Sequence, residues 1–362
     1  MKNSKYLFIL SILLVIFLCF SIFTCTSKSK IQIALVTKFD KASTVGESEI
    51  LFAKFYLEQN PKSKIKIKFY DDGWDPGKAQ TAFNDILKDN IKFIISSDTS
   101  TAILAYYDKL VKEDIFCISC GATSTMLTNK DDNLFRIIPD LNYEQKQIAN
   151  YINSLDGRNL LLIVDTKNKN YTYPSLEYIK QHVTNKKIQT LFVDGELFNI
   201  ETVKKSLSGK KYDICYFIVG SGMVKIGVIA QILYNTNKHC QFIFTPWVIS
   251  VGIAMTLGSA IDNCTFSSFY QSPDDNKDFD QLINVFKSKF GFSPTITSYK
   301  IYEAMQILDR AFSNHCTDPE SVKRYFKENP YQKTVLEEII FNEYGDCISD
   351  IYFIKDIEKI IR

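Results

Sequence analysis

Two short runs of hydroxyl-bearing residues are the part of this sequence best suited to chemistry. Ser96 to Thr101 carries five hydroxyls between an expected strand end and an expected helix start. Gly121 to Thr125 carries three more, with a glycine that allows close backbone approach. Short hydroxyls and the free N–H groups of a helix start bind carboxylates, and the helix dipole favours the negative charge. Serine and threonine are also ordinary helix caps, so the two runs predict either an anion site or two capped helices.

Motifs that mark enzyme active sites do not occur in this sequence. There is no GxSxG turn, P-loop, HExxH pair or GxGxxG fingerprint, and Gly220-Ser-Gly222 is too short to count. Cys117 and Cys120 form a CxxC, but on a strand over 115–119 side chains three apart point to opposite faces. We interpret these cysteines as small buried hydrophobes, and we expect a binding protein, not an enzyme, with no metal and no cofactor.

The composition predicts two packed domains with balanced charge. The chain has 362 residues, of which 46% are hydrophobic and 23% are charged. The first 24 residues hold two lysines and no acidic residue, and the remainder has 41 basic and 41 acidic side chains. This balance argues against nucleic acid or an anionic membrane surface as the main partner.

The amino terminus is typical of an export signal. Residues 1–5 carry two lysines, residues 6–23 are almost wholly apolar, and the chain then turns polar. Cys25 stands at this switch and follows Ile22-Phe-Thr24, a loose match to a bacterial lipobox. We predict a signal peptide over 1–24, lipidation of Cys25 and a short tether over 25–30. An uncleaved anchor is the alternative, because the apolar run is about long enough to span a bilayer.

Strand and helix patterns alternate along the rest of the chain. The first set has expected strands, with helices between them, at 31–36, 64–69, 92–95 and 115–119. The second set starts near residue 140, with expected strands at 159–164, 188–193, 213–219 and 241–244, and the chain closes with strands at 335–341 and 348–354. This order predicts two α/β lobes, each a parallel sheet covered by helices on both faces. Ligands of such folds bind at the strand carboxyl ends, here in a crevice between the lobes.

Several short motifs resemble the branched-chain amino acid binding proteins of ABC transporters, a family with the type I periplasmic-binding fold. The run YDDGWDPGKA at 70–79 looks like the turn after the family's second strand, and ISCGATS at 118–124 resembles its Ile-Ser-Pro-x-Ala-Thr signature. LFRIIP at 134–139, FGFSPT at 290–295 and YEAM at 302–305 follow in the family's order and spacing. Together these motifs cover nearly all of the chain after the amino-terminal segment.

The resemblance implies two Rossmann-like lobes joined by a hinge of three crossovers. We expect the crossovers near 137–140, 268–272 and 329–333. The first lobe would then hold residues 31–139 plus 270–331, and the second lobe residues 140–269 plus 332–362.

The resemblance also implies one wall of a ligand site on the first lobe. Ser100, Gly121 and Thr123 match positions that hold an amino acid's carboxylate and share its ammonium, and Ala122 belongs to the same turn. If instead Ser100 and Thr123 are only helix caps, their hydroxyls would stabilise the fold and leave ligand affinity unchanged.

The second wall departs from the family. A crevice tyrosine is matched by Tyr171 or Tyr173, and Ser221 replaces a further aromatic residue. Trp247 stands where the family has the acid that neutralises an ammonium, or is simply a packed aromatic residue. A buried unpaired ammonium is costly, so an amino acid ligand needs another acid, for which Asp165 is the nearest by sequence.

Two functions therefore remain open. The leading prediction is an extracytoplasmic solute-binding lipoprotein, a monomer without nucleic acid partners. It would capture a small polar, amino acid-like or carboxylate ligand for the permease subunits of an ABC importer, and would touch the membrane through its lipid anchor only. The alternative is an envelope lipoprotein of the same fold that acts as an interaction or regulatory module, which the changes at Ser221 and Trp247 motivate.

Overall fold

Lobe 1 is built on a parallel sheet of strand order β2-β1-β3-β4-β5. The computed structural model describes residues 30–39, 43–195, 197–220, 224–357 and 361. The strands of this sheet are β1 (Ile31–Thr37), β2 (Ile65–Asp71), β3 (Phe93–Ser96), β4 (Phe116–Ser119) and β5 (Leu134–Arg136). The lobe also holds α2 (Thr44–Gln59), α3 (Pro76–Lys88), α4 (Ser100–Lys112), η1 (Thr125–Leu127), α10 (Lys277–Phe290), α11 (Ile296–Ser313) and α12 (Pro319–Glu328).

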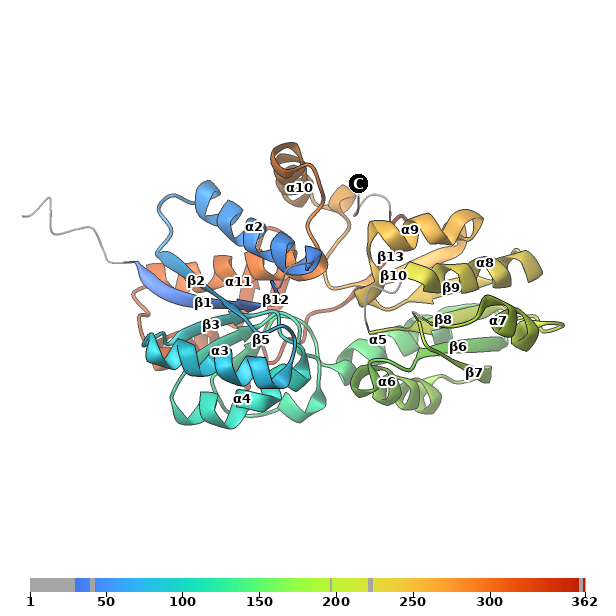
Figure 1. Ribbon diagram of the computed structural model, residues 1–362, viewed down its shortest axis with the longest axis horizontal. Helices are drawn as coiled ribbons and strands as arrows, with labels where there is room; N and C mark the ends of the chain where they lie inside the picture. The colour runs from blue at the N-terminus through green and yellow to red at the C-terminus, as the bar shows by residue number, and fades with distance from the viewer. Residues whose placement is uncertain (1–29, 40–42, 196, 221–223, 358–360, 362) are drawn as a thin grey trace, which may run out of the picture.

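Lobe 2 repeats the design with the order β13-β10-β9-β8-β6-β7, in which β13 runs antiparallel to β10. Its strands are β6 (Asn159–Asp165), β7 (Lys187–Val193), β8 (Ile214–Ile218), β9 (Gln241–Phe244), β10 (Cys264–Ser268) and β13 (Tyr352–Ile354). Its helices are α5 (Leu141–Ser154), α6 (Lys169–His182), α7 (Ile200–Leu207), η2 (Val224–Ile226), α8 (Gly227–Thr236), η3 (Pro246–Val248), α9 (Val251–Leu257) and η4 (Gly258–Asn263). Figure 1 shows the two lobes side by side.

Alternating side chains along the strands build a core on each face of each sheet. In β1, Ile33 and Leu35 pack on the side of α2 and α11, whereas Ala34 and Val36 pack on the side of α3 and α4. Lobe 2 is divided in the same way, with α5 and α6 on one face and α7, α8 and α9 on the other. Both sheets are therefore buried on both faces, as the strand–helix alternation predicts.

The CxxC cysteines follow this division. Cys117 lies in the core between the sheet and helices α3 and α4, and Cys120 lies in the core on the opposite side. Both thiols are buried and unpaired by disulfides. They pack as small apolar side chains in separate cores, which agrees with the structural interpretation.

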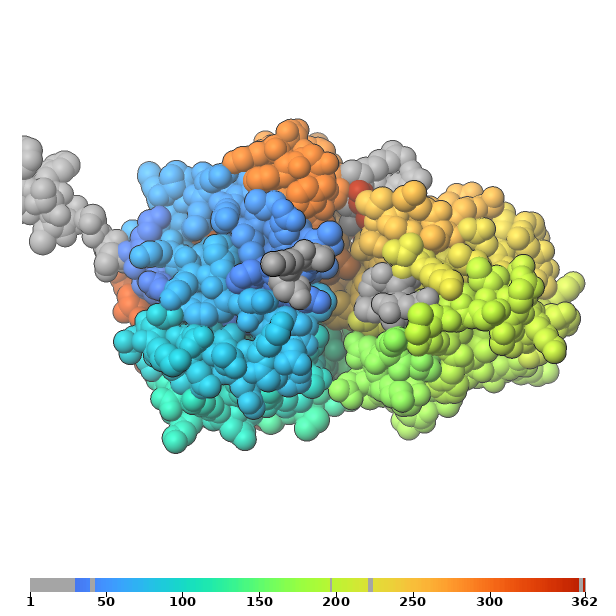
Figure 2. Space-filling model, viewed as in Figure 1, coloured from blue at the N-terminus to red at the C-terminus, as the bar shows by residue number. Residues whose placement is uncertain are grey.

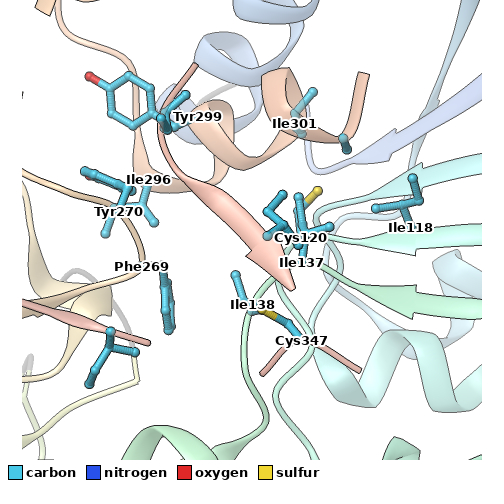
Figure 3. Packing of buried hydrophobic residues seen from close by; sticks show 14 of the residues in the cluster. Ile118, Cys120, Ile137, Ile138, Phe269, Tyr270, Ile296, Tyr299, Ile301 and Cys347 are labelled. Carbon is cyan, nitrogen blue, oxygen red and sulfur yellow. The ribbon is translucent and has the colours of Figure 1, made fainter. Parts of the chain in front are cut away.

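One continuous core crosses the hinge. Ile137 and Ile138 of the first crossover pack with Phe269 and Tyr270 of the second, and Cys347 of the third crossover joins them (Figure 3). The first two crossovers lie at 137–140 and 269–276, between strand ends and the next helices, where the predicted spans were 137–140 and 268–272.

The third crossover lies later in the chain than predicted, at 341–351 rather than 329–333. Strands β11 (Tyr331–Lys333) and β12 (Glu338–Ile340) pair with each other and remain on lobe 1, so residues 332–340 do not belong to lobe 2. The reason is that α11 needs their polar side chains. Arg310 donates to Gln332 at 2.9 Å, and the fully buried Lys300 pairs with Glu337. The two final expected strands consequently join different sheets.

Candidate functional site

The carboxyl edges of the two parallel sheets meet at a crevice. Strands β5 and β10 each lead directly into a crossover, so the carboxyl ends of both sheets lie on the side that faces the other lobe. In both lobes the first strand has its second strand on one side and its third on the other, which is the switch point where open α/β sheets bind ligands. Figure 2 shows the furrow between the blue-to-cyan lobe 1 and the green-to-yellow lobe 2.

The two hydroxyl runs come together on lobe 1. Ser100 is the first residue of α4, and its Oγ accepts the N–H of Ser124 at 3.0 Å. The helix cap is Thr99, whose side chain accepts from Ala102 N. Thr123 does not cap a helix either, because Ser124 caps η1. The capping alternative is therefore wrong for both Ser100 and Thr123.

The Thr123 side chain keeps its hydroxyl available. Thr123 is 6% exposed, and within the described part of the chain its hydroxyl has no recorded hydrogen-bond partner. Its carbonyl oxygen accepts the N–H of Leu141 at 2.8 Å, which ties this turn to the first residue of α5. Thr123 thus joins lobe 1 to the start of lobe 2.

Gly121 and Ala122 serve the turn itself. A Cβ on Gly121 would lie 2.7 Å from the Ser97 carbonyl oxygen and 2.9 Å from that of Asp98, so only glycine fits between the two loops. The Ala122 side chain is fully buried, and its N–H donates to Ser119 Oγ at 3.1 Å. The prediction of Ala122 as a ligand contact is therefore wrong for its side chain and N–H, which the lobe already uses.

Asp165 is committed to its own turn. It is fully buried at the end of β6, and its carboxylate accepts backbone N–H groups from Lys167 at 3.0 Å, Asn168 at 3.4 Å and Gly195 at 3.4 Å. This carboxylate therefore stabilises its own loop. The geometry gives no support to the prediction that Asp165 neutralises an ammonium.

Of the two candidate tyrosines on lobe 2, Tyr171 is the one that packs on Trp247. Its ring is 5% exposed and packs edge-to-face on Trp247, with centroids 6.3 Å apart. Tyr173 lies on the outer surface against Phe192 and is 37% exposed. Trp247 also packs on Phe269 of the second crossover at 5.2 Å. The aromatic wall therefore stands beside the hinge.

Sequence reasoning missed a buried acid behind this wall. Glu144 of α5 is fully buried, and its Oε1 accepts the Tyr171 hydroxyl and the side-chain N–H of Gln145, the latter at 3.0 Å. Burial raises the pKa of Glu144 to about 8. Gln145 in turn accepts the hydroxyl of Tyr216 at 3.0 Å. A signal existed in the sequence, because Glu144 falls on the apolar stripe of α5 that continues through Ile148.

A second buried acid lies at the switch point of lobe 1. Thr37, the last residue of β1, and Ser97, just after β3, donate their hydroxyls to Glu49 Oε2, the latter at 2.7 Å. Burial raises the pKa of Glu49 to about 7, and the nearby hydroxyl of Thr297 acts against that rise. All its hydroxyl neighbours belong to lobe 1, so Glu49 fastens α2 to β1, β3 and α11.

Comparison with known proteins decides the family. The model of the periplasmic binding protein family matches residues 60–357, which is most of the chain. The chain belongs to the periplasmic binding protein family.

Relatives of this periplasmic binding protein bind different solutes. A Leu/Ile/Val-binding protein homolog from Brucella melitensis is 25% identical over 291 residues, 78% of this chain and 76% of the relative. The branched-chain amino acid transporter binding protein of Streptococcus pneumoniae in complex with isoleucine has a TM-score of 0.73 at 14% identity, over 90% of this chain and 95% of that one. A solute binding protein from Rhodopseudomonas palustris in complex with 3,4-dihydroxybenzoic acid has a TM-score of 0.76 at 14% identity, over 90% and 92%. These structures confirm the predicted type I fold.

Ser221 and Cys25 lie outside the described residues. Within the described residues, no group of histidine, cysteine and acidic side chains could hold a metal ion. None of the helices described from Lys30 onward is both long and apolar enough to cross a bilayer. A cavity of about 550 Å³ lies between β2 and α3, outside the crevice, and its lining includes the ion pair Lys68–Asp89.

Proposed function

We propose that this periplasmic binding protein is an extracytoplasmic receptor for a small solute that carries a carboxylate. One observation carries the proposal. Ser100 and the 121–124 turn meet at the carboxyl edge of lobe 1, neither Ser100 nor Thr123 caps a helix, and the Thr123 hydroxyl has no recorded partner among the described residues. Two hydroxyls at the start of α4 suit a carboxylate, because the helix dipole favours an anion there.

The relatives support this ligand class. Leucine, isoleucine, valine and 3,4-dihydroxybenzoic acid, as named for the relatives, all carry a carboxylate and differ in the rest of the molecule. A shared carboxylate grip on lobe 1, with a variable wall on lobe 2, accounts for that pattern. In this chain the variable wall is Tyr171 and Trp247.

Capture requires the lobes to open and close about the hinge. Across the crevice, Asn170 at the start of α6 donates to the Thr101 hydroxyl of α4 at 3.2 Å. This exposed bond must break for a ligand to reach Thr123, and a bound ligand that contacts both walls favours the closed state through its differential affinity. We propose that the closed receptor delivers the solute to the permease subunits of an ABC importer, which membership of the family supports.

The membrane attachment is also part of the proposal. Lipidation at Cys25 would hold the monomeric receptor at the membrane after removal of residues 1–24. Metabolic labelling with a palmitate analogue should tag the wild-type chain and not Cys25→Ala. Equal labelling of the two would refute the anchor without touching the ligand proposal.

The ligand proposal is tested by calorimetric titration after a thermal-shift screen of amino acids, aromatic acids and small carboxylates. Thr123→Ala should weaken binding by about ten- to hundred-fold, because a hydrogen bond to a charged group contributes about 1.5–3 kcal/mol. Its melting temperature should stay unchanged. Thr125→Ala, in the same turn but exposed, is the matched control and should bind like the wild type. Unchanged affinity in Thr123→Ala would defeat the assignment.

A second function is favoured by the direct bond that bridges the crevice. Asn170 bonds directly to Thr101 across the crevice, and by the family resemblance Trp247 stands where an acid is expected. A receptor that has lost small-ligand binding and acts as an interaction or regulatory module of the envelope would also show these features. The same screen separates the two functions, since this module would be stabilised by none of the compounds.

A further inference from the structure

We propose that Glu144 is the acid that receives a protonated amine of the ligand, so that the receptor selects amino acids over plain carboxylates. This proposal rests on the carboxylate site proposed above and adds the second charged group that the ligand must carry. The acid that neutralises the ammonium would then lie on α5, the first helix of lobe 2, and not at the strand-end position where this chain has Trp247.

The first support is the position of Glu144 beside the lobe 1 site. Helix α5 begins immediately after the first crossover, and the N–H of its first residue, Leu141, donates to the Thr123 carbonyl oxygen at 2.8 Å. Glu144 follows within the next turn of the helix. In an amino acid, the carboxylate and the ammonium are both bonded to the α-carbon. A site for an amino acid therefore needs a group that binds an anion next to a group that binds a cation. Thr123 and Glu144 supply that neighbourhood.

The second support is an unused oxygen. Glu144 Oε1 accepts the hydroxyl of Tyr171 and the amide of Gln145, whereas Oε2 is buried and has no hydrogen-bond partner among the described residues. A buried carboxyl oxygen without a partner costs free energy, which a donor on a ligand would recover. Glu144 is fully buried, so packing fixes the position of this oxygen.

The third support is that no described residue next to Glu144 supplies a cation. Glu144 faces Tyr171 from α6, Tyr216 from β8 through Gln145, and Asp140 on its own helix, whose negative charge acts against ionisation. The buried Glu303 and Glu337 differ, because they share Lys300. Glu49, Asp72 and Asp98 also have a buried carboxyl oxygen without a partner among the described residues, but they lie on lobe 1, whereas Glu144 lies on lobe 2 beside the aromatic wall.

The aromatic wall connects this acid to the crevice. The Trp247 ring packs edge-to-face on the ring of Tyr171, and the Tyr171 hydroxyl donates to Glu144. Trp247 is half-buried, whereas Tyr171 is almost covered. A ligand closed between the lobes would touch the two aromatic rings and reach the acid beside them. A cation near these rings also gains from their negative faces.

The binding step has a defined proton balance. In the free protein at neutral pH the Glu144 carboxyl carries its proton, since burial holds its pKa at about 8. Binding of an ammonium ionises the carboxyl, forms the ion pair and transfers the proton to the buffer. A carboxylate ligand without an amine leaves that proton in place.

The test compares each amino acid found in the screen with its desamino acid, and includes benzoate. Titrations of the purified full-length chain at pH 7, in two buffers of different ionisation enthalpy, should show release of about one proton per amino acid bound and none for benzoate. Glu144→Gln should lose about tenfold or more in affinity for the amino acid and change little for its desamino acid. Glu49→Gln, equally buried but outside the proposed ligand contacts, is the matched control.

Each outcome decides between the proposals. Proton release with amino acids, lost in Glu144→Gln and kept in Glu49→Gln, supports the assignment. If Glu144→Gln does not fold, the proton count on the wild type still decides. Equal affinity for amino and desamino acids, or binding without proton release, overturns the role of Glu144 and leaves the carboxylate site intact. If no carboxylate binds at all, the proposed function fails and this inference fails with it.

Discussion

The two walls of the crevice are built from different chemistry and are stabilised in different ways. On lobe 1 the wall consists of small hydroxyl side chains and turns, exemplified by Ser100 and Thr123, whose removal takes away few packing contacts. On lobe 2 it consists of aromatic rings packed on a buried acid, in the chain Trp247–Tyr171–Glu144. Substitutions in the lobe 1 wall should therefore act mainly on ligand affinity. Substitutions in the lobe 2 wall should change both the choice of ligand and the stability of the fold.

The largest effect is expected for a substitution that disrupts the lobe 2 wall. Tyr171→Ala should lower the free energy of unfolding by about 3 kcal/mol, because a buried ring is deleted and Glu144 loses its donor. Tyr171→Phe keeps the ring and should lose only about 1–2 kcal/mol. Urea unfolding of both variants measures this. Wild-type stability in Tyr171→Ala would show that the wall does not couple to the fold.

A pH profile of stability sharpens the comparison between the buried acids of the two lobes. Burial raises the pKa of Glu49 to about 7 and of Glu144 to about 8, from 4.5. The folded state then binds more protons than the unfolded state, so this contribution to stability is complete below pH 4.5 and is lost as the pH rises through the folded pKa values. Each group contributes a slope of up to about 1.4 kcal/mol per pH unit.

The stability contributions of the two acids are lost over pH ranges that end at different values, near pH 7 for Glu49 and near pH 8 for Glu144. Glu144→Gln should flatten the profile of stability against pH up to about pH 8, and Glu49→Gln only up to about pH 7. Thermal unfolding at half-unit steps of pH measures both. A Glu144→Gln profile parallel to that of the wild type would mean that this carboxyl is not held protonated in the folded chain.

On lobe 1 a smaller effect is expected, mainly in affinity, although loss of the bond from the Ser124 N–H to Ser100 Oγ also costs about 0.5–1.5 kcal/mol of stability. Ser100→Ala should weaken carboxylate binding by about tenfold, since one hydrogen bond to a charged oxygen is lost. Thr99→Ala next to it removes the cap of α4 and should cost about 1 kcal/mol of stability with affinity unchanged. Titration and melting of this pair measure the contrast, and the reverse pattern would exchange the two roles.

The smallest effect concerns the bond between the walls. Thr101→Ala removes the exposed contact with Asn170 and should change the free energy of closure by less than about 1 kcal/mol. Small-angle scattering of the ligand-free chain should show a slightly larger radius of gyration than for the wild type. An unchanged radius would mean that the hinge core, not this bond, sets the closed arrangement.

The meeting of the two hydroxyl runs on lobe 1 could be predicted from the sequence for a physical reason. Its residues follow directly after β3 and β4, and the carboxyl ends of parallel strands converge, so chain position alone brings Ser100 and Thr123 together. The fold was predictable in the same way, from strand and helix periods and the order of motifs. The choice between Tyr171 and Tyr173 was not, because only burial against Trp247 distinguishes them.

The acid of lobe 2 and the third crossover depend on contacts far apart in the chain. Helical periodicity predicts an apolar side chain at the position of Glu144. Its burial depends on the hydrogen bond from the hydroxyl of Tyr171, which lies on the next helix along the chain. The segment after Pro330 stays on lobe 1 because Lys300 of α11 needs Glu337. Asp165 looked available by sequence distance, but the turn that it caps uses its oxygens. Pairings of this kind have no local signature.

The most direct test of the account is the crystal structure of the chain with the tightest-binding carboxylate from the screen. The account predicts that the ligand lies in the crevice, with its carboxylate within hydrogen-bond distance of the Ser100 and Thr123 hydroxyls and its remaining atoms against Tyr171 and Trp247. A ligand bound in the cavity between β2 and α3, with Asn170 still bonded to Thr101 across an empty crevice, would contradict it.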